Sequence, residues 1–219
     1  MNKLLTEYQT LVFDCDGVVL NSNKVKTQAF YEATKHFGHE SAQALVDYHV
    51  ANGGISRYLK FDYFLEDIIQ TRVDDSVLQD LLQRFANAVK DGLMTCDVAP
   101  GLTELRNQTQ SSNWMIVSGG DQQELREVFH ARGLLHLFNG GIFGSPDDKE
   151  KILAREKLTK NIDGNALFLG DSKYDYLAAN KAGLDFVFLS DWTEVKDWQN
   201  WVSENSLRNY PNVESLVAL

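Results

Sequence analysis

Five short apolar runs recur along the chain, and each of them ends in a polar or glycine-containing turn. The runs are rich in β-branched and aromatic residues, a pattern typical of strands that are buried on both faces of a sheet. The predicted strands are Leu11–Asp14, Trp114–Ser118, Gly141–Ser145, Ala166–Asp171 and Phe186–Ser190.

Amphipathic stretches of helix length separate the later runs. They are Asp121–Arg132, Asp147–Leu158 and Lys173–Ala182. Each begins with a polar or charged residue suited to a helix start, and two run into glycine, at Gly133 and Gly183. Strands that alternate with helices form a parallel sheet. The pattern therefore predicts an α/β fold with a doubly wound, Rossmann-like parallel sheet.

The chain between the first two runs has a different pattern. It contains no strand signal and several helical ones, for example Lys60–Gln70 and Val77–Val89. We therefore predict an all-helical subdomain inserted into the α/β core. The predicted domains are the core, residues 1–19 and 96–219, and the helical insertion, residues 20–95.

Polar groups follow four of the five predicted strands. Asp14 and Asp171 end the first and fourth runs, Ser118 ends the second, and Lys149 follows the third. Because ligands of open parallel sheets bind at the carboxyl ends of the strands, we expect these four side chains to meet in one pocket. Taken singly, Ser118 is equally well explained as a turn residue, and Lys149 as a solvated charge on a helix.

Two pairs of carboxylates lie in these segments. Asp14 and Asp16 are two residues apart, and Gly17 allows a sharp turn after them. Asp171 and Asp175 are four residues apart, a spacing that places both on one face of a helix. Carboxylates this close repel one another unless a cation or a proton separates them. A magnesium ion together with one protonated carboxyl would meet this requirement. An exposed acidic turn and a helix N-cap at Asp171 are the alternatives.

Composition narrows the class of protein. The net charge of −10, with no basic run interleaved with aromatics, argues against a nucleic-acid partner. Cys15 and Cys96 have no disulfide or metal spacing, and we expect both to be buried and reduced. No signal-peptide stretch or membrane-spanning apolar run is visible, so we expect a cytoplasmic protein, monomeric or homodimeric, without a membrane partner.

At these motifs the sequence resembles the haloacid dehalogenase-like hydrolases over nearly its whole length. The matching segments are Phe13-Asp14-Cys15-Asp16-Gly17-Val18, Ser118 after an apolar strand, Lys149 on a helix, and Gly170-Asp171-Ser172 with Asp175. The helical insertion is similar to the cap that encloses small substrates in the branch of phosphoglycolate phosphatases and β-phosphoglucomutases. Four motifs in this order are a specific signal, whereas a lone Asp-x-Asp is not.

The resemblance implies a role for each side chain. Asp14 would be the nucleophile that forms an aspartyl-phosphate, and Asp16 would be the acid and then the base. Ser118, Gly119 and Lys149 would hold the phosphoryl oxygens, where charge develops.

The resemblance also implies Mg²⁺ as the cofactor. Its ligands would be Asp14, the backbone carbonyl of Asp16, and Asp171, which are hard oxygen donors. Asp175 would be a further ligand through water, or would orient Lys149.

The segment Gly53-Gly54-Ile55-Ser56-Arg57 lies where capped relatives place a substrate-specificity loop. Arg57 would bind an anionic or hydroxyl-rich part of the substrate, or it is an ordinary surface arginine. For Lys24 and Lys26 we expect solvent exposure, with the cleft as the alternative.

The leading hypothesis is a magnesium-dependent phosphatase acting on a small phosphate ester, such as a sugar phosphate or a sugar-acid phosphate. A phosphomutase uses the same two aspartates and differs in how well the closed cap excludes water. A third alternative is a non-catalytic, partner-binding protein on the same scaffold. It is disfavoured by the intact set Asp14, Asp16, Ser118, Lys149 and Asp171.

Overall fold

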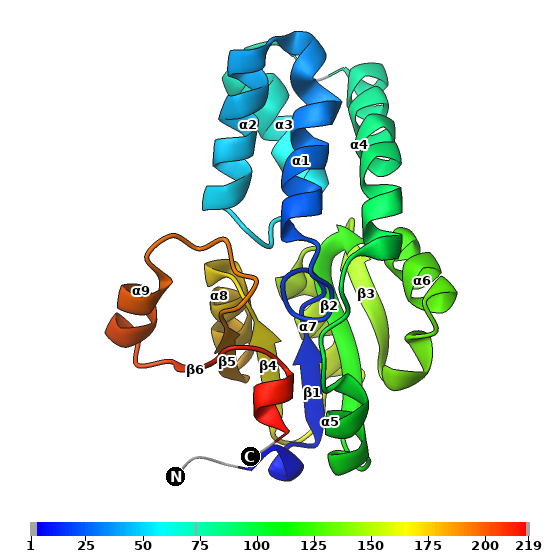
Figure 1. Ribbon diagram of the computed structural model, residues 1–219, viewed down its shortest axis with the longest axis vertical. Coiled ribbons are helices and arrows are strands. Elements are labelled where there is room, and N and C mark those ends of the chain that lie inside the picture. Colours follow the sequence, from blue (N-terminus) through cyan, green and yellow to red (C-terminus); the bar gives the residue numbers. More distant parts are fainter. Residues whose placement is uncertain (1–3, 73, 218–219) are drawn as a thin grey trace.

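The protein is built on one parallel sheet, shown in Figure 1. The computed structural model describes residues 4–72 and 74–217. In spatial order the strands are β3 (Gly141–Ser145), β2 (Asn113–Asp121), β1 (Thr10–Phe13), β4 (Ala166–Gly170), β5 (Asp185–Leu189) and β6 (Arg208–Tyr210). The chain passes from β1 outward to β3 and then returns to β4 on the other side of β1. The strand order therefore reverses between β1 and β4, a position at which open α/β sheets bind ligands.

Helices cover both faces of this sheet. They are α5 (Leu102–Gln108), α6 (Gln122–Ala131), α7 (Lys149–Leu158), α8 (Lys173–Ala182) and α9 (Trp198–Glu204). Leu11 and Phe13 of β1 pack in a hydrophobic cluster with residues of α5 and α6. Val12, which points to the opposite face, packs in a second cluster with residues of α7, α8 and α9. This arrangement confirms the predicted doubly wound α/β fold.

The predicted strands all form, and α6, α7 and α8 lie where helices were predicted. Strand β6 was not predicted from the sequence, because its three residues are polar or only half-buried and lie at the edge of the sheet. Cys15 is buried as expected, but the same expectation for Cys96 is wrong, since Cys96 is only partly buried. No helix formed by the described residues is both long and apolar enough to cross a membrane.

Four helices stand together above the carboxyl end of β1 (Figure 1). They are α1 (Asn23–Thr34), α2 (His39–Ala51), α3 (Arg57–Tyr63) and α4 (Asp75–Thr95). The short helical turns of the chain are η1 (Leu5–Glu7), η2 (Lys35–Phe37), η3 (Phe64–Ile68), η4 (Leu135–Leu137) and η5 (Glu214–Leu216). The two segments that join the four helices to the sheet meet in a bridge between Leu20 and Val98. The boundaries 1–19, 20–95 and 96–219 stay a prediction, and we call α1 to α4 the cap.

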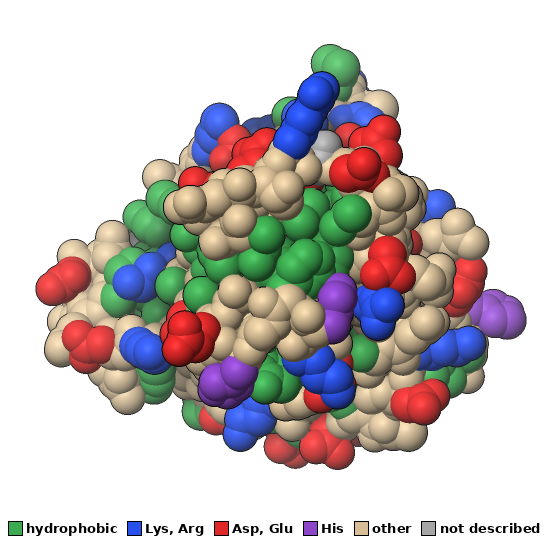
Figure 2. Space-filling view, turned by 90° about the horizontal axis from the view of Figure 1, so that it is seen from above, with side chains coloured by type: hydrophobic (Ala, Val, Ile, Leu, Met, Phe, Trp, Pro, Cys, Tyr) green, Lys and Arg blue, Asp and Glu red, His purple; other side chains and the backbone are tan. Residues whose placement is uncertain are grey.

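Aromatic rings fill the interior of the cap. Phe30, Phe61 and Phe85 come from α1, α3 and α4, and their ring centroids lie 4.4–6.0 Å apart. They belong to the same hydrophobic cluster as Phe13 of the sheet, so the cap and the sheet share a continuous core. Seen from the cap end, hydrophobic side chains gather at the centre of the surface among polar ones (Figure 2).

Candidate active site

A pocket lies between the carboxyl ends of β1 and β4 and the helices of the cap. The predicted site residues that line it are Asp14, Asp16, Arg57, Gly119 and Asp171. Its volume of about 50 Å³ has room for roughly four ordered water molecules. The pocket therefore admits only a small chemical group. Ser118, Lys149 and Asp175 lie fully buried beside it.

The end of β1 fixes Asp14. Its backbone N–H donates to the carbonyl of Leu169 on β4 at 2.9 Å, and its Oδ1 accepts from the Cys15 N–H at 2.7 Å. Gly17 follows with φ of +75°, and a Cβ there would lie 2.1 Å from Oδ2 of Asp171. A glycine is thus required where the loop turns past the carboxylate at the end of β4.

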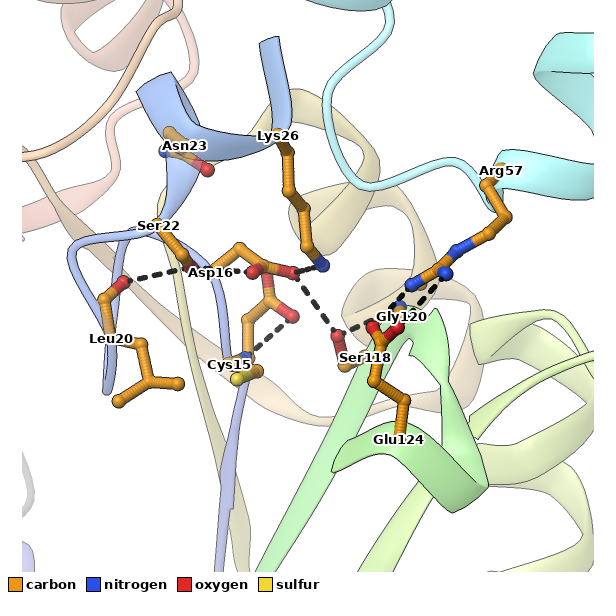
Figure 3. A network of polar contacts seen from close by, with 12 residues as sticks. Cys15, Asp16, Leu20, Ser22, Asn23, Lys26, Arg57, Ser118, Gly120 and Glu124 are labelled. Carbon is orange, nitrogen blue, oxygen red and sulfur yellow. Dashed lines mark hydrogen bonds and ion pairs between the residues drawn. The ribbon is translucent and has the colours of Figure 1, made fainter. Parts of the chain in front are cut away.

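Asp16 accepts hydrogen bonds at both of its carboxylate oxygens, as Figure 3 shows. Ser22 donates to Oδ1 at 2.6 Å, and Lys26 donates to Oδ2 at 2.5 Å. Burial by itself raises the pKa of Asp16, but Lys26 and Ser22 outweigh this and hold the pKa below its usual range. The expectation that Lys26 faces solvent is therefore wrong, whereas Lys24 is exposed as expected.

Lys149 is fully buried between two carboxylates, so its interpretation as a solvated charge is wrong. Its Nζ lies 2.8 Å from Oδ1 of Asp14 and 2.5 Å from Oδ1 of Asp175. Burial lowers the pKa of Lys149, but the two carboxylates raise it by a larger amount. The pKa of Lys149 therefore lies above its ordinary value. The pKa of Asp14 is raised to about 7, mainly by burial. Lys149 acts in the opposite direction, whereas the charges of Asp175 and Asp16 raise the pKa further.

Three buried carboxylates form an acidic cluster. Asp14, Asp171 and Asp175 each place one oxygen within 4.8 Å of the others. Burial, followed by the charges of Asp175 and Asp14, raises the pKa of Asp171 well above its ordinary value. Lys149 balances only one of the three negative charges. The cluster therefore fits a hard divalent cation, which prefers carboxylate oxygens and would relieve their repulsion.

Asp175 uses both of its oxygens within the protein. Oδ1 accepts from Lys149, and Oδ2 accepts from the Asp171 N–H and from the N–H and hydroxyl of Ser172, at 2.7–3.2 Å. Ser172, and not Asp171, is the N-cap of α8, so the N-cap interpretation of Asp171 is wrong. The side chain of Asp171 instead accepts from Asn23 of α1 at 2.7 Å.

Ser118 and Gly119 lie within β2, so the turn interpretation of Ser118 is wrong. The hydroxyl of Ser118 accepts from the Gly120 N–H at 3.0 Å and lies 3.5 Å from Asp16. A Cβ at Gly119 would lie only 2.3 Å from the carbonyl oxygen of Gly54 in the cap. Gly119 thus allows the loop between α2 and α3 to lie directly against the end of β2.

Arg57 is only 6% exposed, so its interpretation as a surface arginine is wrong. Its guanidinium donates to both carboxylate oxygens of Glu124 on α6, at 3.2 and 2.5 Å (Figure 3). It also lies 4.5 Å from the ring centroid of Phe85. This pair joins the cap to the sheet domain. A contact between Arg57 and substrate stays a prediction.

Lys60 of α3 and His49 of α2 also line the pocket, and neither was predicted from the sequence. Nζ of Lys60 lies 2.6 Å from Nδ1 of His49, and both side chains are buried. Burial, with the nearby charge of Lys26, lowers the pKa of Lys60 to about 7. Burial, followed by the charge of Lys60, lowers the pKa of His49 to about 2, so its imidazole is neutral.

The family of the chain follows from a direct comparison. A family model described as haloacid dehalogenase-like hydrolase matches residues 8–183, which is most of the sequence. The chain therefore belongs to the haloacid dehalogenase-like hydrolases, as the four motifs indicated. A comparison with curated proteins finds no match.

Solved structures share this fold. A hydrolase from Pseudomonas syringae is 20% identical, with a TM-score of 0.72, and the match covers 96% of each chain. A predicted phosphoglycolate phosphatase from Haemophilus somnus is 16% identical, with a TM-score of 0.74, over 98% of each chain. A phosphonoacetaldehyde hydrolase-like protein from Oleispira antarctica is 15% identical, with a TM-score of 0.73, over 99% of this chain and 92% of that one. At these identities the likeness establishes the fold.

Proposed function

We propose that this hydrolase is a magnesium-dependent phosphatase that acts on small phosphate esters. The observation that carries this function is the buried carboxylate of Asp14, held beside Lys149 in the pocket that Asp16 and Asp171 also border. One small ligand would then contact four groups at once. They are a nucleophile (Asp14), a lysine that binds phosphate (Lys149), an acid–base group (Asp16) and a metal-binding carboxylate (Asp171). The name of the Haemophilus somnus neighbour, a predicted phosphoglycolate phosphatase, is in line with this chemistry.

Hydrolysis would proceed in two displacements at phosphorus. An oxygen of Asp14 attacks the phosphoryl group, the bond from phosphorus to the alcohol oxygen breaks, and Asp16 protonates that oxygen. Asp16 then removes a proton from water, whose oxygen attacks the aspartyl-phosphate, so that inorganic phosphate leaves and Asp14 is restored. Because Lys26 holds Asp16 as a carboxylate, its acid role requires that the negative charge of the bound substrate first raise its pKa.

The remaining groups would hold the phosphoryl oxygens. Ser118, Gly119 and Lys149 would supply the donors, and the side chains of Ser118 and Lys149 are fixed by burial before substrate arrives. Because both oxygens of Asp175 already accept hydrogen bonds, its proposed role is to orient Lys149. Mg²⁺ held by Asp14, the Asp16 carbonyl and Asp171 would offset the negative charge of the phosphoryl group.

A panel of small phosphate esters, including p-nitrophenyl phosphate, tests this function. We expect release of inorganic phosphate with Mg²⁺ and none in excess chelator. Full activity in chelator would contradict the metal dependence. Absence of phosphate release from every ester in the panel would favour a non-catalytic partner-binding protein. Transfer of phosphate to a second hydroxyl, without inorganic phosphate, would identify a phosphomutase. A cytoplasmic location, and a monomer or homodimer without nucleic-acid or membrane partners, stay predictions.

A further inference from the structure

Three basic side chains of the cap line the pocket, but only two of them have an acidic partner. Lys26 and Arg57 each form an ion pair with a carboxylate at 2.5 Å. Lys60 contacts the neutral ring of His49 and lies 5.5 Å from the ring centroid of Phe30. No carboxylate of the described residues lies within ion-pairing distance of Lys60.

Burial of Lys60 without an acidic partner is unfavourable. The side chain is only 1% exposed, and an ammonium removed from water is costly unless a counter-charge compensates it. Glu194 lines the same pocket, but it accepts hydrogen bonds from Thr27 and makes no ion pair with Lys60. An anion that entered the pocket would supply the missing charge.

His49 offers a second donor beside Lys60. The Lys60 ammonium has only hydrogens to give, so Nδ1 of the neutral imidazole accepts and Nε2 carries the ring proton. Nε2 is buried and has no hydrogen-bond partner among the described residues. A buried donor without an acceptor is uncommon in folded proteins and is explained by a ligand that supplies one.

The position of Lys60 and His49 suits contact with the leaving group of a substrate. Lys60 and His49 line the same pocket as Asp16, the proposed acid for the alcohol oxygen, and its charge acts on both of them. The pocket, with a volume of about 50 Å³, is too small to hold a long molecule. One short ester would therefore reach from Asp14 to the cap side.

We propose that Lys60 and His49 form a second anion-binding subsite, which binds a carboxylate on the leaving-group end of a short phosphate ester. This subsite rests on the phosphatase function proposed above. With this subsite, the preferred substrate would be a phosphorylated small carboxylic acid. A purely structural role of the pair in the cap core predicts instead that substrate choice is independent of Lys60.

Three two-carbon esters separate these outcomes. Phosphoglycolate, ethyl phosphate and O-phosphoethanolamine share the phosphate and end in a carboxylate, a methyl group and an ammonium, respectively. We expect the wild type to prefer phosphoglycolate over ethyl phosphate by roughly 10- to 150-fold in kcat/KM, the loss expected for one charge-assisted hydrogen bond. O-phosphoethanolamine should be the poorest of the three.

The variant Lys60→Met should reduce this preference to near one, and His49→Phe should reduce it in part. Lys24→Met is the matched control, because Lys24 is exposed on α1, and it should keep the wild-type preference. If Lys60→Met does not fold, the preference for phosphoglycolate in the wild type and in His49→Phe still tests whether the subsite exists. Equal preferences in the wild type and both pocket variants would overturn the subsite.

A failed subsite and a failed phosphatase give different results. Turnover of ethyl phosphate and p-nitrophenyl phosphate without a preference for phosphoglycolate overturns the subsite and keeps the phosphatase. If no ester is turned over, calorimetry with phosphoglycolate and ethyl phosphate replaces kinetics. Tighter binding of phosphoglycolate that depends on Lys60 then supports the subsite while the phosphatase fails, and equal binding overturns both.

Discussion

Lys26 on the first helix of the cap and Asp16 on the loop after β1 form an ion pair with an Nζ–Oδ2 distance of 2.5 Å. Both side chains are largely buried, at 10% and 14% exposure. The cap is thereby tied to the residue proposed as acid and base. A change at Lys26 should consequently affect both the attachment of the cap to the sheet and the chemistry of Asp16.

A double-mutant cycle measures this coupling. Lys26→Met leaves a buried carboxylate without its cation, which typically lowers the free energy of unfolding by about 3–5 kcal/mol. Lys26→Met combined with Asp16→Asn should cost less than the sum of the single changes, by about 0.5–3 kcal/mol. Urea unfolding gives the values, and Lys24→Met serves as the control. Additive costs would show that the two side chains do not interact in solution.

The proposed chemistry assigns different losses to the two aspartates. Asp14→Asn should abolish turnover, because an amide of nearly the same shape is a poor nucleophile. It should not lower stability at neutral pH, since burial and neighbouring carboxylates already disfavour the ionised form of Asp14. Asp16→Asn should slow turnover roughly 10²- to 10⁴-fold. Initial rates and circular dichroism decide, and near-normal turnover by either variant would contradict the assigned roles.

Metal binding is measurable without turnover. Mg²⁺ at about 100 times its dissociation constant should raise the free energy of unfolding by about 2.7 kcal/mol, visible as a higher Tm. Asp171→Asn should remove this rise. Without Mg²⁺ the variant should be no less stable than the wild type, because repulsion within the acidic cluster is relieved. Glu127→Gln, at an exposed acid of α6, should keep the response to Mg²⁺. An unchanged response in Asp171→Asn would place the metal elsewhere.

The sheet and the acidic groups at its edge could be predicted from the sequence for a simple physical reason. Buried parallel strands have continuous apolar patterns, and their carboxyl ends meet at one edge, so Asp14 and Asp171 had to lie close together. The fold prediction was confirmed on that basis. The roles of these residues in catalysis stay predictions that the experiments above address.

The cap side of the pocket was harder to predict, because its basic residues occupy apolar positions of amphipathic helices. Lys26 shares the buried face of α1 with Ala29, Phe30 and Ala33, at helical spacing, yet an isolated lysine is normally assigned to solvent. Lys60 lies on the buried face of α3 in the same way. A lysine at the core-facing position of a helix was the available signal, and the partner on another helix was not visible in the sequence.

Substitution of Arg57 tests whether the cap contacts the substrate directly. We expect Arg57→Ala to lower kcat/KM for the preferred ester by roughly 10- to 150-fold, and to affect p-nitrophenyl phosphate less. Glu124→Gln is the matched comparison, since it weakens the pair with Arg57 and keeps the guanidinium. If both variants had equal effects on both substrates, Arg57 would act by holding the cap against α6, and substrate contact would be wrong.

Lys60 should make the stability of the protein depend on pH in a definite direction. Its pKa is lowered from 10.5 to about 7, mainly by burial. Below pH 7 both the folded and the unfolded chain carry the charge, so folding bears the full cost of burying it. Between about pH 7 and 10.5 the unfolded chain binds the proton and the folded chain does not, so stability rises with pH, by up to roughly 5 kcal/mol.

Comparison with Lys60→Met isolates this effect, because methionine fills a similar volume without a charge. The variant should gain stability relative to the wild type at pH 6.5, and this gain should shrink at pH 10, where Lys60 is neutral in the fold. Urea unfolding of both proteins at the two pH values gives the difference, in which the titration of other groups cancels. Lys24→Met is the matched control, since it removes a lysine whose side chain is exposed. A constant difference between wild type and Lys60→Met would mean that the lysine keeps its ordinary pKa in the folded protein.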